Sequence, residues 1–174
     1  MGHAELKEWT LLSPLPDLFE KDGGGRIASA EEWAAQREQK RQEVAEAVAK
    51  RQLHIDITSM STLRYGSKAV TSDFFLELRG DTLQSYLPYL GRAYQGPMHS
   101  PSIGLNFETC VRSISETRPK SNRSRFEIGV KTEEDSYQYV VEVYDTGQAN
   151  IRVSSQHRDP ISYDGEVVTT NFRR

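Results

Sequence analysis

Residues 126–153 read FEIGVKTEEDSYQYVVEVYDTGQANIRV, and this stretch decides the fold class. Large apolar residues recur at every second position in three of its segments, 126–130, 137–143 and 151–153. That period places them on one face of an extended strand. The two connections, a polar tip at 133–136 and an Asp145-Thr146-Gly147 turn, are typical of hairpins. The stretch therefore predicts consecutive antiparallel strands.

The same alternation continues outward along the chain in both directions. Its further segments are 53–57, 74–78, 83–87 and 103–107, with 161–167 as an additional candidate. No long helical segment separates them, which argues against a parallel sheet with crossover helices. We predict an α+β fold: one N-terminal helix packed on a curved antiparallel β-sheet or open barrel of about seven to eight strands.

One helix is predicted before the strands. Ser29-Ala30-Glu31-Glu32 has the spacing of a capping box, and strong helix formers continue to about Lys50 without Gly or Pro. The residues able to dock are Trp33, Val44, Ala47 and Val48. A thin apolar stripe of this kind is typical of a helix lying on a sheet, and a partner helix or coiled-coil arm is the alternative.

The chain divides by composition into an arm and a domain. Residues 1–52 contain 12 large apolar side chains, whereas residues 53–174 contain 40. Breaker clusters at 13–17 and 22–25 interrupt any regular element there. We therefore predict an irregular N-terminal arm over 1–28 and a single α+β domain over 29–174.

Composition excludes several classes of protein. The 174 residues carry 22 Lys and Arg against 25 Asp and Glu, and a net charge of -3 disfavours nucleic acid as a partner. No apolar run is long enough for a transmembrane segment. The single cysteine, Cys110, cannot form an intrachain disulfide, and its place in an alternating strand predicts a buried, inert thiol.

Motifs that carry chemistry are missing. There is no Gly-x-Ser-x-Gly elbow and no phosphate-binding loop. His54 and Asp56 share one strand face, which is too few groups for a metal site and is typical of a solvent-facing pair. We predict no catalytic residue, no metal and no cofactor, and hence no enzyme. A hydrolase would need convergent carboxylates in a pocket, such as Asp56, Glu77 or Glu142.

The least ordinary stretch is a tyrosine-rich bend. Pro88 and Gly91 break a strand there, and the side chains crowded around them are Tyr86, Tyr89, Arg92 and Tyr94. Aromatic rings with polar tips favour contact with ligands, so we predict these four as ligand-binding residues. Alternatively, the rings pack across the sheet and their hydroxyls bond to backbone. A basic run over 118–125 marks a hairpin tip, which either solubilises the protein or meets an anionic ligand.

Several ordered blocks of sequence resemble a known family. They are residues 80–94, 104–107, 133–137, 145–147 and 158–165. Together they resemble domain-of-unknown-function family 4251 over roughly residues 45–168, with a departure at 98–102, where family members tend to be Gly-rich. The resemblance implies an exported protein of Bacteroidota, often a lipoprotein. It therefore implies a periplasmic or cell-surface location, lipid-anchored in the full-length precursor, with the signal removed here, and no known catalytic residue.

A second likeness covers residues 15–33. It is similar to the segment that precedes the catalytic domain of some bacterial carbohydrate esterases, although the esterase core is absent. We therefore expect an uncharacterised extracytoplasmic binding or interaction module whose partner is a small molecule, a glycan or a protein. The alternative is an uncharacterised hydrolase acting on carbohydrate-type substrates.

Overall fold

The computed structural model describes residues 20–21, 25–26, 30–70, 73–90 and 104–169. The chain falls into two compact units, residues 1–38 and 39–174. In the first unit, β1 (Glu20–Lys21) pairs antiparallel with β2 (Gly25–Arg26). Most of the predicted arm lies outside the described residues.

Helix α1 (Ala30–Lys50) confirms the predicted helix. It ends at Lys50, and at the next residue, Arg51, the backbone turns to a positive φ of 51° and the amide donates to the carbonyl of Val48. Val44 and Val48, four residues apart and therefore on one face, are its buried residues. Trp33 lies in the first unit, where it is 46% exposed and contacts Arg37 through a cation–π interaction. Its docking on the sheet stays a prediction.

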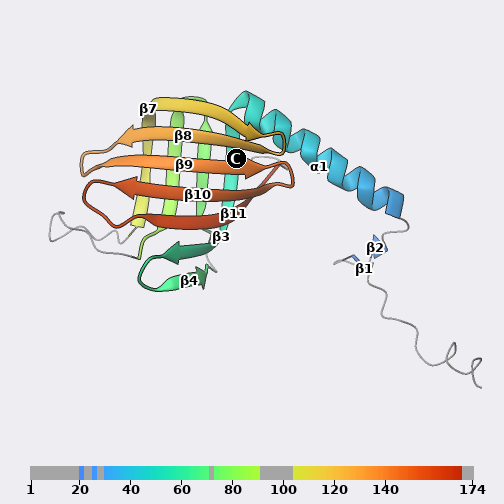
Figure 1. Cartoon of the computed structure of the whole chain (residues 1–174), viewed down its shortest axis with the longest axis horizontal. Helices are drawn as coiled ribbons and strands as arrows, with labels where there is room; N and C mark the ends of the chain where they lie inside the picture. Colours follow the sequence, from blue (N-terminus) through green and yellow to red (C-terminus); the bar gives the residue numbers. More distant parts are fainter. Residues whose placement is uncertain (1–19, 22–24, 27–29, 71–72, 91–103, 170–174) are drawn as a thin grey trace, which may run out of the picture. The chain divides into compact units, whose positions relative to one another are not determined.

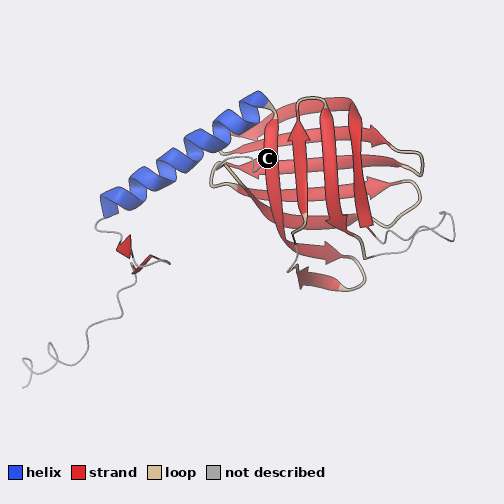
Figure 2. Cartoon of the chain, turned by 180° about the vertical axis from the view of Figure 1, so that it is seen from behind, coloured by secondary structure: helices blue, strands red, loops and turns tan. Residues whose placement is uncertain are grey.

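The second unit is built on an antiparallel sheet. Its strands are β3 (Gln52–Thr62), β4 (Gly66–Ala69), β5 (Phe75–Arg79), β6 (Thr82–Pro88), β7 (Gly104–Lys120), β8 (Arg123–Lys131), β9 (Ser136–Tyr144), β10 (Gln148–Ser155) and β11 (Ile161–Val167). Neighbouring strands pair in the order β11-β10-β9-β8-β7-β6-β5-β3-β4, and β11 also pairs with β3. Among the described residues, eight strands thus close into a barrel, and β4 is added to the end of β3 (Figure 1, Figure 2). The predicted α+β class is confirmed, and the barrel is closed.

Two features let a sheet of this size close. Strand β7 pairs with β6 over 104–110 and with β8 over 111–120, so it bends between two groups of strands that cross in Figure 1. At the seam between β11 and β3 the register shifts at Gly165. A Cβ atom on Gly165 would lie 2.3 Å from the carbonyl oxygen of Asp56, so glycine is required for the two backbones to approach.

Side chains fill the barrel. Most inward positions of the eight strands are buried, although β7 is only half-buried at Phe107 and Val111. The largest fully buried side chains are Tyr139, Tyr163 and Phe126. A cavity of about 10 Å³ lies among the aliphatic side chains, with walls that include Leu53, Leu83 and Phe126. That is about the space of one water molecule. Like other small barrels, this one encloses a packed core in that region.

Two further expectations can be compared with the structure. Cys110 is exposed, so the prediction of a buried thiol is wrong. It shares the outward side of β7 with Asn106 and Glu108, opposite the inward Leu105 and Phe107, as the alternation of the strand requires. No helix within the described ranges is long and apolar enough to cross a membrane.

Candidate functional site

The outward side of β3, β5, β6 and β7 carries two cross-strand rows of side chains, which we call the outer face. Strand register aligns the first row as Asp56, Phe75, Tyr86 and Asn106. It aligns the second row as His54, Glu77, Gln84 and Glu108. These rows arise because each strand alternates, with its other side chains buried in the barrel.

Aromatic rings stack along this face. The centroids of His54 and Phe75 lie 5.0 Å apart, and those of Phe75 and Tyr86 lie 5.8 Å apart. Phe74 stacks on Tyr86 at 5.3 Å. Tyr86 remains 42% exposed although two phenylalanine rings flank it. Such separations are typical of favourable aromatic pairs, so the rings form a supported platform open to solvent.

A network of charged groups borders the platform. The Glu77 side chain is only 5% exposed, forms an ion pair with Arg79, and lies 3.4 Å from Nδ1 of His54. Nε2 of His54 lies 3.1 Å from Oδ1 of Asp56, so the ring bridges two carboxylates. The hydrogen bond to Glu77 raises the pKa of the Arg79 guanidinium. The buried carboxylate of Glu77 is therefore paired, and it fixes the orientation of its two neighbours.

The carboxylates that a hydrolase would need are only partly brought together. Asp56 and Glu77 each lie within hydrogen-bonding distance of one ring nitrogen of His54. Glu142 lies apart from them and forms an ion pair with Arg123 at 3.4 Å. The region described by the structure contains no group of three or more His, Cys, Asp or Glu side chains able to hold a metal ion.

The four predicted ligand-binding residues do not form one described group. Tyr86 points outward, whereas Tyr89 is 8% exposed and continues the inward series of Leu83, Ser85 and Leu87. The Tyr89 hydroxyl donates to the carbonyl of Asp159, and burial raises its pKa. The structure thus places Tyr86 and Tyr89 on opposite sides of the sheet. Arg92 and Tyr94 lie outside the described residues.

Tyr89 belongs to a tyrosine cluster inside one end of the barrel. Tyr139 donates to Ser85 at 3.2 Å, and Tyr163 donates to the carbonyl of Pro88 at 2.6 Å. Burial raises the pKa of both hydroxyls. Tyr89 therefore follows the alternative prediction, in which the ring packs inside the fold and its hydroxyl bonds to backbone.

Sequence reasoning missed the partners of Tyr86. A signal existed, because a tight turn at 79–81 between two predicted strands fixes the pairing of Phe75 with Tyr86. Phe74 and His54 could not be placed in this way, since the stacking of Phe74 depends on its local backbone and that of His54 on the pairing of β3 with β5.

The fold and this face define a class: a small closed antiparallel barrel with a packed core and an aromatic, polar outer surface. Residues 35–167 match the family described as Domain of unknown function (DUF4251), and the chain belongs to that family. This confirms the resemblance noted in the sequence. A DUF4251 family protein from Bacteroides eggerthii DSM 20697, known from a crystal structure at 1.95 Å resolution, is similar in fold. Its TM-score is 0.59 at 14% identity, over 77% of this chain and 90% of that chain, which shows the fold alone. No curated protein matches this chain.

Proposed function

We propose that this protein is an extracytoplasmic binding module that binds a glycan on its outer face. The observation that carries the proposal is the exposed Tyr86 ring, which stacks on Phe74 and contacts Phe75 at a tilt. A surface aromatic ring that is rigidly supported loses little conformational entropy when a ligand stacks on it.

The chemistry of the surrounding groups favours a sugar. A pyranose ring offers a C–H surface that stacks on an aromatic ring and a rim of hydroxyls that donate and accept hydrogen bonds. Asp56, Asn106 and Glu108 are exposed beside the platform and supply acceptors and one amide donor. The carboxylates make the face a poor match for an anionic ligand, so a neutral glycan is the best fit.

The packed core of the barrel also favours a binding site on the outer surface. The cavity among the core side chains holds about 10 Å³, which is too small for a sugar residue. A sugar residue therefore binds on the outer surface of the barrel and not in its core.

The proposed location rests on the family. The resemblance noted in the sequence implies an exported protein, and we extend the proposal to a periplasmic or cell-surface location with a lipid anchor on the full-length precursor. Glycans are the polymers that such a location exposes to a binding module.

The test is glycan-array screening of the full chain, followed by calorimetry with the best neutral oligosaccharide. Tyr86→Ala is expected to weaken binding about tenfold, which corresponds to about 1.4 kcal/mol. Tyr65→Ala is the matched control, because Tyr65 is also exposed but lies at the turn before β4. Its affinity is expected to equal that of the unaltered protein.

Three results would contradict the proposal: no neutral glycan binds, Tyr86→Ala binds as well as the unaltered chain, or both variants lose affinity equally. Release of shortened oligosaccharides during the assay would favour the hydrolase instead. His54 with its two carboxylates, next to the platform, would then be the group to alter first.

A further inference from the structure

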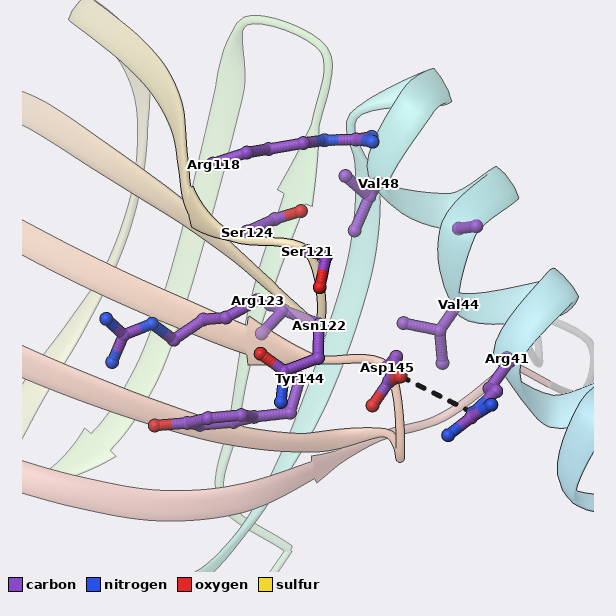
Figure 3. A pocket seen from close by; sticks show the side chains of 12 residues that line it. Arg41, Val44, Val48, Arg118, Ser121, Asn122, Arg123, Ser124, Tyr144 and Asp145 are labelled. Carbon is purple, nitrogen blue, oxygen red and sulfur yellow. Dashed lines mark ion pairs between the residues drawn. The ribbon is translucent and has the colours of Figure 1, made fainter.

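A pocket of about 80 Å³ lies between α1 and the barrel. Its walls are the C-terminal half of α1, the hairpin between β7 and β8, and the end of β9, all within the unit 39–174 (Figure 3). The basic run predicted as a hairpin tip supplies the hairpin wall. None of the outer-face residues lines this pocket, so it is a separate place on the molecule.

The pocket has an apolar side. Val44, Val48 and Val143 line it and are almost fully buried. These side chains offer a surface for a short aliphatic group rather than for a fully hydrated ion.

The cations of the pocket differ in how they are paired. Arg41 forms an ion pair with Asp145 at 3.4 Å (Figure 3). Arg123 forms one with Glu142 at 3.4 Å. Arg118 forms no ion pair or side-chain hydrogen bond with any residue that the structure describes. In Figure 3 its side chain extends toward Val48 of the helix. Among the described residues, the pocket therefore holds one guanidinium, that of Arg118, whose charge no carboxylate neutralises.

We propose that this pocket binds a small aliphatic monocarboxylate. The carboxylate accepts two parallel hydrogen bonds from the guanidinium of Arg118, a geometry that a planar fork and a planar carboxylate share. The aliphatic body lies against Val44 and Val48, and the hydroxyls of Ser121 and Ser124 stand at the hairpin wall as further donors.

The charge count selects the ligand class. One uncompensated cation matches one negative charge, whereas a phosphate dianion would leave a second charge unpaired in a partly apolar pocket. The volume selects the size, because about 80 Å³ accommodates a chain of about two to four carbons.

The experiment is a titration of the full isotope-labelled chain with butyrate, followed by amide chemical shifts. We expect shifts confined to residues 41–48, 118–124 and 143–145, with a dissociation constant on the order of millimolar. Arg118→Gln is expected to weaken butyrate at least tenfold. Arg112→Gln is the matched control, because Arg112 is an exposed arginine of the same strand that does not line the pocket. That variant is expected to bind as the unaltered chain does.

Two further probes complete the test. Butyramide has the same shape without the charge, and inorganic phosphate has the charge without the aliphatic body. Both are expected to bind at least tenfold more weakly than butyrate. Equal binding of either probe, an unchanged affinity in Arg118→Gln, or no shifts with butyrate would overturn the proposal. Thermal melting of Arg118→Gln is expected to match that of the unaltered chain, since the side chain is exposed. Because the pocket and the outer face share no residue, failure here leaves the glycan proposal unaffected.

Discussion

Replacing Gly165 with alanine should open the seam of the barrel. The added methyl group would lie 2.3 Å from the carbonyl oxygen of Asp56 and 2.9 Å from Cγ2 of Ile55. Ordinary contacts of a Cβ atom begin at about 3.4 Å, so β11 and β3 would have to separate locally by about 1 Å. The obstacle is backbone, which cannot rotate away as a side chain can.

The expected loss follows from two contributions. Overpacking of a close-fitted site costs about 1 to 3 kcal/mol. A local separation of about 1 Å would also break one or two ladder hydrogen bonds between β11 and β3, each worth about 1 kcal/mol. We therefore expect Gly165→Ala to lower the free energy of unfolding by about 3 kcal/mol.

The assay is urea unfolding followed by circular dichroism, with Gly129→Ala as the matched control. Gly129 is also a strand glycine, and its added Cβ would meet the hydroxyl oxygen of Ser113 at 2.5 Å. That oxygen ends an exposed, rotatable side chain, so the control is expected to lose less than about 1 kcal/mol. If both variants lose the same amount, or if Gly165→Ala lies within about 0.5 kcal/mol of the unaltered chain, the seam does not depend on glycine.

Two other changes test the helix and the pH dependence. Val48→Ala should lower the free energy of unfolding in urea by about 2 kcal/mol, because Val48 is buried in the core. Trp33→Ala should lower it by less than about 0.5 kcal/mol, because Trp33 is exposed. Equal losses would contradict the observed burial of these two side chains. Burial opposes ionisation of Asp135, but hydrogen bonds from the Ser136 amide, Ser155 and His157 outweigh it and lower the pKa of that carboxyl. A lowered folded-state pKa gives stability above the unfolded pKa of about 3.9 that is lost as the pH falls through the folded value, so Asp135→Asn should flatten the acid side of a stability profile.

Local sequence determined most of the secondary structure. Apolar residues at every second position placed the strands, because such a period can bury one face only in an extended chain. Glycine turns such as Asp145-Thr146-Gly147 made neighbouring strands antiparallel, since short connections leave no room for a crossover. The helix over 30–50 followed from an uninterrupted run of helix formers after a capping sequence. These features depend on residues close together in the chain.

Tertiary structure decided what distant residues do together. Closure joins β11 to β3, whose paired residues lie about a hundred positions apart, and no local pattern records that pairing or the need for Gly165 within it. Tyr86 was predicted from the sequence as a ligand-binding residue, yet the aromatic rings beside it come together only when β3 and β5 bring His54 and Phe75 there. An alternating pattern can be identified within one segment, whereas a surface forms only when several segments pack side by side.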